Sequence, residues 1–235
     1  MTLELFRDDG YLRACKATVT SVEGRNICTD QTVFYPAGGG QPGDWGTMKW
    51  QGACVQVMDT TKDRTSNNIL HLLAENSVLP VVGTPVQLEI DWARRHRLMR
   101  MHSLLHMLCV AIPAPVTGGS VRDGSGRLDF DLPEPPDRVA IEMRINDLIE
   151  QNAPMQLHWI SDEEMAERPE LVRTMSVQPP IGMGKVRLVE FVGVDLQPCG
   201  GTHVAATGEI GPVKIHSIKK KGKQNRRITV VFANS

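Results

Sequence analysis

The sequence contains no apolar run long enough to cross a membrane, since no stretch approaches the ~20 apolar residues that a spanning helix needs. Residues 1–16 carry charges from the fourth position onward and lack the apolar core of a signal peptide. We therefore expect a cytoplasmic protein with no membrane partner. The 235 residues, 41% hydrophobic and 23% charged, are enough for one large globular domain or two modest ones.

Paired cysteines and repeats are also missing. The five cysteines are scattered without short pairwise spacing, which argues against a disulfide framework, and most are expected to be buried thiols. The glycine-rich run at residues 34–46 lacks the Gly-Lys-Ser/Thr ending of a phosphate-binding loop, so a nucleotide site of that type is disfavoured. With no internal repeat to follow, the domain organisation is predicted from the order of short segments.

Residues 3–90 consist of short β-type segments separated by turn residues, which predicts a small β-barrel-like domain over residues 1–90. Asp91 is a typical N-cap, and a mostly apolar stretch, residues 92–112, follows it. Because this stretch is apolar nearly all round after its first turns, we expect a buried central helix in a second domain, residues 91–235.

The remaining segments mix strands and helices without regular alternation, which favours an α+β fold over a doubly wound sheet. The second domain is expected to be a two-layer α/β domain. Its predicted elements are a strand pair at 121–132, a helix at 138–152 capped by Asp137, a short helix with a Ser161–Glu164 capping box, a strand at 185–192, and a terminal hairpin of 212–221 and 226–232.

Two histidines on the predicted central helix suggest a metal site. His102 and His106 are four residues apart, hence about 40° apart around the helix axis, so both imidazoles can reach one ion. Such a pair often arises by chance. Cys199 and His203 bracket Gly-Gly-Thr in a turn-like segment, and two His with a Cys-His pair form a zinc ligand set. The alternative is that Cys199 is a buried thiol and His203 a core histidine.

The kind of zinc chemistry is a separate question. Ser103 stands where a metalloprotease HExxH helix has its glutamate, so a protease of that class is disfavoured. Four protein ligands normally mark a closed structural site, whereas catalysis requires a position for water. Catalysis here therefore requires one loosely bound ligand or expansion to five-coordination.

Three motifs together resemble a known family. The segments MRMHSLLHML, QPCGGTHVAATGEIG and FYPAGGGQPGDWG are similar to the editing domain of alanyl-tRNA synthetase and its free-standing AlaX relatives, over a range from about Thr29 to the C-terminus. The resemblance implies that the family's zinc ligands fall on His102, His106, Cys199 and His203, with one zinc per chain. It also places the family's glycine-rich motif on Gly38, Gly39, Gly40 and Gln41.

The activity that this resemblance implies is hydrolysis of tRNA(Ala) mischarged with serine, and glycyl-tRNA(Ala) is a further candidate substrate. A synthetase pocket built for alanine cannot strongly exclude serine, so a second site that hydrogen-bonds the extra hydroxyl is needed. Thr32 matches a family threonine near the amino-acid pocket, and we expect Thr32 and Gln41 to act in catalysis and Gly38, Gly39 and Gly40 to contact substrate. The alternative is that Thr32 is an ordinary strand residue.

Basic residues gather near the C-terminus, where residues 212–235 contain seven Lys or Arg and no Asp or Glu. We expect this hairpin to contact the tRNA backbone, with Arg94, Arg95, Arg97 and Arg100 as a second patch. A solvated charged face is the alternative for the hairpin. For some of the four arginines the alternative is that their stems cover apolar surface. The expected contacts are Lys219, Lys220, Lys221, Arg226 and Arg227.

Two classes of function therefore stay open: a zinc-dependent aminoacyl-tRNA deacylase, and a non-catalytic tRNA-binding module with a structural zinc. A monomer is favoured for either class.

Overall fold

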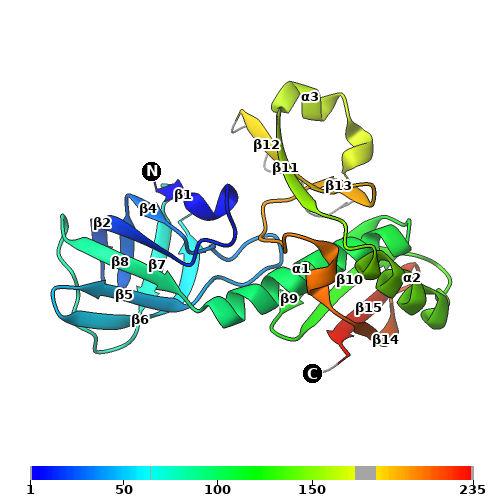
Figure 1. Ribbon diagram of the computed structural model, residues 1–235, viewed down its shortest axis with the longest axis horizontal. Coiled ribbons are helices and arrows are strands. Elements are labelled where there is room, and N and C mark those ends of the chain that lie inside the picture. The colour runs from blue at the N-terminus through cyan, green and yellow to red at the C-terminus, as the bar shows by residue number, and fades with distance from the viewer. Residues whose placement is uncertain (1, 64, 173–183, 234–235) are drawn as a thin grey trace. The chain divides into compact units, whose positions relative to one another are not determined.

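The structure is a computed structural model that describes residues 2–63, 65–172 and 184–233. The chain divides into two compact units, which we call unit 1 (Met1–His96) and unit 2 (Arg97–Ser235). Helix α1 (Trp92–Ala111) begins in unit 1 and continues in unit 2 (Figure 1). The boundary expected between residues 90 and 91 therefore stays a prediction.

Unit 1 is a closed six-stranded barrel with the strand order β2-β3-β7-β6-β5-β8, which confirms the expected barrel-like domain. A short parallel pair, β1-β4, stands beside it. Alternating side chains of these strands fill the interior. The strands are β1 (Leu3–Glu4), β2 (Ala14–Glu23), β3 (Asn26–Thr29), β4 (Gln31–Thr32), β5 (Gly46–Trp50), β6 (Ala53–Lys62), β7 (Ile69–Leu73) and β8 (Pro85–Ile90), with a 3₁₀ turn at Leu5–Arg7.

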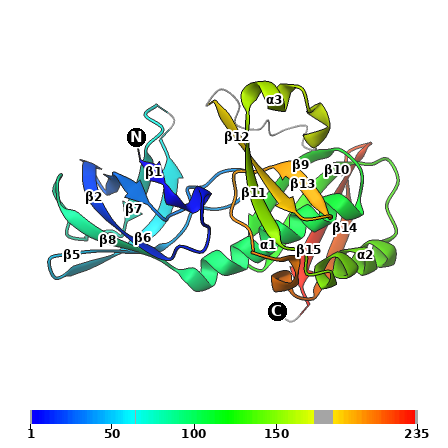
Figure 2. The same cartoon turned by 45° about the horizontal axis from the view of Figure 1, so that its top comes forward.

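Two sheets make up most of unit 2. The four-stranded sheet has the order β14-β15-β10-β9, and the three-stranded sheet has the order β11-β12-β13. Figure 2 shows β11, β12 and β13 side by side with the short helix α3 next to them. The strands are β9 (Val116–Arg122), β10 (Ser125–Asp131), β11 (Met155–Ser161), β12 (Lys185–Phe191), β13 (Asp195–Pro198), β14 (Val213–Lys221) and β15 (Asn225–Phe232).

The helices of unit 2 confirm the expected caps. Asp137 accepts hydrogen bonds from two backbone amides at the start of α2 (Arg138–Glu150). Ser161 and Glu164 form the expected capping box at α3 (Asp162–Ala166). Short 3₁₀ turns lie at Pro169–Leu171 and Thr207–Ile210. No helix within the described ranges is both long and apolar enough to cross a membrane.

Helix α1 is the buried central helix that the sequence predicted. Its residues from Leu98 to Leu108 are almost all buried, and Asp91 caps its first turn by accepting a hydrogen bond from the Arg94 amide at 3.0 Å. Gly126 of β10 allows close packing, because a Cβ there would lie 2.7 Å from the Met101 sulfur. The chain of unit 2 therefore folds around a helix that carries His102 and His106.

Candidate metal centre

Cys199 and His203 lie in the loop that follows β13, and Arg187 of β12 holds that loop in place. The buried Arg187 guanidinium donates from Nη1 to the carbonyl of Cys199 at 2.8 Å and to that of Gly201 at 2.9 Å. The Cys199 amide in turn donates to the Arg187 carbonyl at 3.1 Å. The short segment 199–203 can therefore aim both of its ligands at one point.

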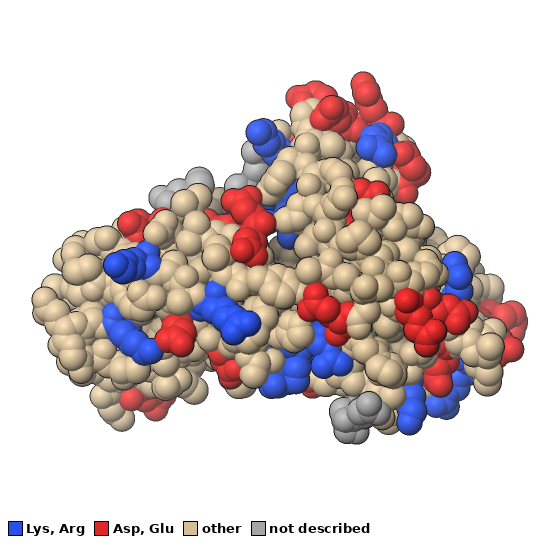
Figure 3. Space-filling view, viewed as in Figure 1, with Lys and Arg blue, Asp and Glu red and all other residues tan. Residues whose placement is uncertain are grey.

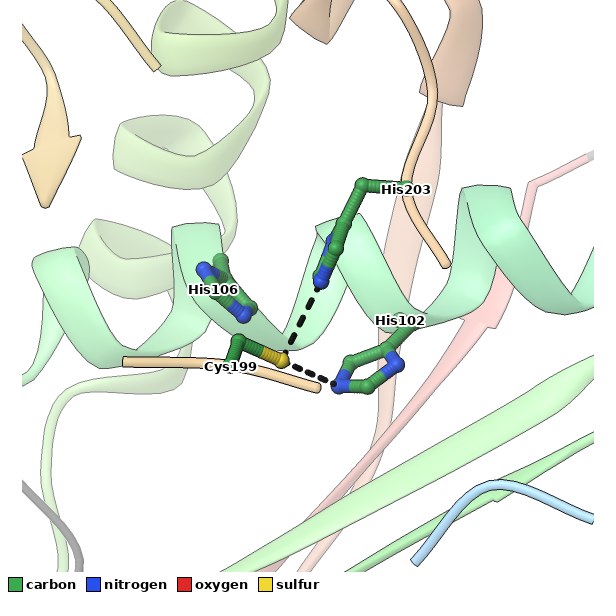
Figure 4. Close-up of side chains that lie close together, drawn as sticks. All are labelled: His102, His106, Cys199 and His203. Carbon is green, nitrogen blue, oxygen red and sulfur yellow. Dashed lines mark hydrogen bonds between the residues drawn. The ribbon is translucent and has the colours of Figure 1, made fainter. Parts of the chain in front are cut away.

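The structure brings all four expected ligands together. The ligand atoms of His102, His106, Cys199 and His203 all lie within 4.8 Å of one another, and Figure 4 shows the three imidazoles grouped around the sulfur. The Cys199 Sγ lies 3.6 Å from His102 Nε2 and 3.2 Å from His203 Nε2.

The 3.6 Å distance from the Cys199 sulfur to His102 Nε2 suits zinc, and the distance to His203 Nε2 is 0.4 Å shorter. In a tetrahedral site with Zn–S and Zn–N bonds of about 2.3 and 2.05 Å, a sulfur and a nitrogen ligand lie about 3.6 Å apart. The donor set of three imidazoles and one thiolate also belongs to zinc rather than to magnesium or calcium, which prefer oxygen. The residues present therefore fit a zinc ion.

Burial and charge prepare these ligands for a cation. Burial opposes ionisation of Cys199, but the charge and hydrogen bonds of the neighbouring histidines, His102 foremost, outweigh it, so the pKa of the thiol is well below its ordinary value. Burial lowers the pKa of His203 to about 3, which keeps that imidazole neutral. A thiolate and a neutral imidazole are the forms that bind metal.

His106 faces a carboxylate. Burial lowers the pKa of His106, but hydrogen bonds to Asp195 and Cys199 outweigh it and raise the pKa to about 9. The same negative groups that favour a proton on this ring also favour a metal cation beside it. His102, His106 and His203 are buried, whereas Cys199 is half-buried. The four ligands therefore form a largely buried cluster.

The glycine-rich motif forms a tight turn in unit 1. Gly38 and Gln41 exchange two backbone hydrogen bonds, at 3.0 and 2.9 Å, and the Tyr35 hydroxyl donates to the Gly38 carbonyl at 2.8 Å. Gly39 and Gly40 both have positive φ, of 55° and 81°. The three glycines are exposed and Gln41 is buried. The turn is thus observed, while substrate contact by these residues stays a prediction.

Thr32 is fully buried in unit 1, at the end of β4. Its hydroxyl oxygen lies 2.8 Å from Nε2 of His71 and accepts a hydrogen bond from the Phe34 amide at 3.0 Å. Thr32 and Gln41 belong to unit 1, whereas the metal cluster belongs to unit 2. Their catalytic roles remain predictions.

The basic hairpin contains residues of two kinds. Lys219, Lys220 and Lys221 of β14 are exposed. In contrast, Arg226 is buried and donates to the Pro133 carbonyl, and Arg227 is held by Asp129 through two hydrogen bonds of 2.7 Å. Figure 3 shows basic side chains along the lower edge of unit 2 near β14 and acidic ones over α3.

The second basic patch expected on α1 is wrong for its first two members. Arg94 and Arg95 are buried: Arg94 donates to the Gly43 carbonyl at 2.8 Å, and Arg95 forms an ion pair with Asp44. Sequence reasoning placed them in a tRNA-contacting patch because their partners lie 51 residues away in the chain. Arg97 pairs with Asp123 on the surface.

Sequence reasoning also missed Arg187, Asp195 and Gln197. A charged residue inside the apolar strand VRLVEF was the available signal for Arg187. For Asp195 and Gln197 the signal was a pair of polar side chains at alternate positions, which a β-strand places on one face.

Two segments of the chain match known protein families. Residues 186–229 match the family model of the threonyl and alanyl tRNA synthetase second additional domain, and residues 6–94 match that of class II (A) tRNA synthetases.

Full-length relatives give a broader match. The chain is 35% identical to the alanyl-tRNA editing protein AlaX-M of Methanosarcina mazei, over 97% of this chain and 95% of that protein. It is 37% identical to AlaX-M of Methanosarcina barkeri, over 97% of this chain and 98% of that protein. It is also 35% identical to the alanine–tRNA ligase of Pyrobaculum arsenaticum, over 93% of this chain but 25% of that ligase.

Proposed function

This chain belongs to the AlaX-M family of alanyl-tRNA editing proteins, and on that premise we propose that it is a zinc-dependent hydrolase that removes serine from mischarged tRNA(Ala). The observation that carries the proposal is the convergence of His102, His106, Cys199 and His203 within 4.8 Å. One zinc per chain is proposed at this point. A zinc ion bound there supplies a Lewis acid for the ester carbonyl and lowers the pKa of a bound water.

The residues of the chain supply the rest of the site. Arg187 fixes the loop that carries Cys199 and His203 through its two carbonyl contacts. The Gly201 amide donates to the Cys199 sulfur at 3.5 Å, which favours the thiolate.

Selectivity follows from a hydroxyl group. An alanine-sized pocket in a synthetase excludes serine poorly, whereas a site that hydrogen-bonds the serine hydroxyl leaves polar groups unpaired when alanine enters. We assign that contact to Thr32, propose a catalytic role for Gln41, and propose that the turn at Gly38, Gly39 and Gly40 touches the substrate. Lys219, Lys220 and Lys221 are proposed to contact phosphates of the tRNA. The proposed setting is a monomer in the cytoplasm.

A non-catalytic tRNA-binding module is the second candidate, and one observation favours it: the site offers a complete set of four protein ligands, which is typical of structural zinc. Catalysis in such a site requires five-coordination or release of one ligand.

Single-turnover deacylation separates the two candidates. Purified seryl-, glycyl- and alanyl-tRNA(Ala) are incubated with excess protein, and the loss of each ester is compared with its spontaneous hydrolysis. The enzyme is expected to cleave the seryl ester faster than the alanyl ester. Binding of all three without any acceleration would assign the chain to the non-catalytic class.

A further inference from the structure

Each metal-facing imidazole has a second ring nitrogen, and in two of the three histidines the structure shows what that nitrogen meets. His106 Nδ1 lies 3.0 Å from Asp195 Oδ2. His203 Nδ1 lies 3.2 Å from Ser103 Oγ, on the opposite side of the ring from the Nε2 that faces the Cys199 sulfur. A neutral imidazole carries one proton, so the nitrogen that bears it cannot bind the metal.

We propose that Asp195 and Ser103 are positioning residues that hold the ring proton of His106 and His203 on Nδ1, so that both imidazoles present Nε2 to the metal. The inference rests on the proposed zinc site and goes beyond its ligands. It assigns a role to a carboxylate and a hydroxyl that are not among the proposed ligands.

Asp195 can only accept hydrogen bonds when it is ionised, and its side chain has no solvent exposure. A buried carboxylate 3.0 Å from His106 Nδ1 therefore places the ring proton on that nitrogen. The Gln197 side-chain amide donates to the same carboxylate oxygen at 2.7 Å. Its nitrogen, which is also a donor, lies 2.9 Å from His106 Nδ1, so the two donors share that oxygen as their acceptor. Gln197 thus keeps the carboxylate in place beside the ring.

Ser103 plays the same part for His203 with a neutral group. Its side chain is fully buried one position after His102 in α1, and its oxygen accepts a hydrogen bond from the Val204 amide at 3.2 Å. That bond fixes the oxygen between the helix and the loop, where it accepts the Nδ1 proton of His203. Because a carboxylate polarises an imidazole more strongly than a hydroxyl does, loss of Asp195 should weaken metal binding more than loss of Ser103.

The test measures zinc affinity in the whole protein by competition with a chromophoric chelator. Asp195→Asn is expected to weaken zinc binding about 10–100-fold, which is the usual effect of losing such a partner. Ser103→Ala is expected to weaken it less, and Ser103→Thr, which keeps the hydroxyl, should restore affinity close to that of the native protein. Asp129→Asn is the matched control, since Asp129 pairs with Arg227 on the sheet of β10 and β15 and should leave zinc affinity unchanged.

Nuclear magnetic resonance reads the tautomer directly. In zinc-loaded protein with ¹⁵N-labelled histidine, His106 and His203 should each show a protonated Nδ1. A protonated Nε2 on either ring, or unchanged zinc affinity in both Asp195→Asn and Ser103→Ala, would overturn the inference.

A purely structural role for these residues has a different signature. It would lower the free energy of unfolding of the metal-free protein while leaving the zinc affinity of the folded protein unchanged, and that outcome also counts against the inference. None of these measurements depends on deacylation. If the native protein binds zinc as described but fails to cleave seryl-tRNA(Ala), the proposed function is rejected and the inference about Asp195 and Ser103 stands.

Discussion

The hydroxyl of Thr32 donates its proton to His71, across 2.8 Å in the interior of unit 1. The direction follows from the other side of the ring, where Nδ1 of His71 lies 3.0 Å from the Ile27 carbonyl and must carry the ring proton. Nε2 is therefore an acceptor. The Thr32 oxygen also accepts a hydrogen bond from the Phe34 amide. Because its own proton is already given to His71, any further partner of this oxygen must be a donor. A serine hydroxyl can donate such a bond, and the methyl group of alanine cannot.

Replacement of Thr32 by valine tests its proposed part in selectivity. The variant keeps the shape of the side chain and removes a hydrogen-bonding partner worth about 0.5–1.5 kcal/mol. We expect the ratio of seryl to alanyl ester cleavage to fall several-fold while zinc content stays the same. Thr32→Ser, which keeps the hydroxyl, is the control. If folded, zinc-loaded Thr32→Val shows the native ratio in parallel single-turnover assays, Thr32 is part of the scaffold only.

His71 should make unit 1 sensitive to acid. Burial lowers the pKa of His71 to about 4, compared with an ordinary value of 6.5. The unfolded chain therefore binds a proton at a higher pH than the folded chain does. Stability from this group is complete above pH 6.5 and is lost as the pH falls toward 4, by at most about 3 kcal/mol.

The variant His71→Asn removes that titration and keeps a donor for the Ile27 carbonyl. It should be less stable than the native protein at pH 7.5, with a difference that shrinks between pH 6.5 and 4. Urea unfolding at several pH values measures this. Two parallel stability curves over that range would show that His71 does not titrate on unfolding.

The ion pair between Arg95 and Asp44 should stabilise unit 1 far more than an exposed pair. Both side chains are almost fully buried, and Arg95 also donates to the carbonyls of Val33 and Gly10. Removing one partner leaves an uncompensated buried charge, so Arg95→Leu should lower the free energy of unfolding by about 3–5 kcal/mol. Arg97→Ala, which breaks an exposed pair with Asp123, should cost less than about 1 kcal/mol. Equal costs for the two variants would contradict this account.

The exposed lysines of β14 should set the salt dependence of tRNA binding. Replacing Lys219, Lys220 and Lys221 by glutamine should weaken tRNA binding and flatten the plot of log affinity against log salt concentration. The slope of that plot should decrease by about one for each phosphate that the variant no longer neutralises. Cleavage of bound substrate should survive. A matched triple variant with the same charge change elsewhere, Lys16→Gln, Lys49→Gln and Lys185→Gln, should keep the native slope. Identical slopes in both triple variants would make the hairpin a solvated face.

Local pattern predicted much of this molecule. Short β-type segments separated by turn residues indicated the barrel. The four-residue spacing of His102 and His106 on a capped apolar stretch indicated two ligands on one helix face. Cys199 and His203 followed from their own short spacing. Each of these signals lies within a few residues of sequence, where backbone geometry alone decides which side chains share a face.

Contacts between distant segments could not be predicted in the same way. Arg95 was expected on a basic surface because nothing near it in sequence shows that Asp44 lies beside it. The strands β11 and β13 were missed, since each depends on pairing with β12 rather than on its own residues. Asp195 became visible as a partner of His106 only when the structure joined segments 89 residues apart.

The central claim, that a zinc ion held by His102, His106, Cys199 and His203 drives deacylation, is tested most directly by one measurement. Single-turnover cleavage of seryl-tRNA(Ala) is followed with the native protein as purified, after removal of metal by a chelator, and after return of one equivalent of zinc, with Cys199→Ala in parallel. We predict fast cleavage, loss of cleavage, and recovery in the native protein, and no recovery in Cys199→Ala. Full cleavage by the metal-free native protein, or by folded Cys199→Ala, would contradict the account.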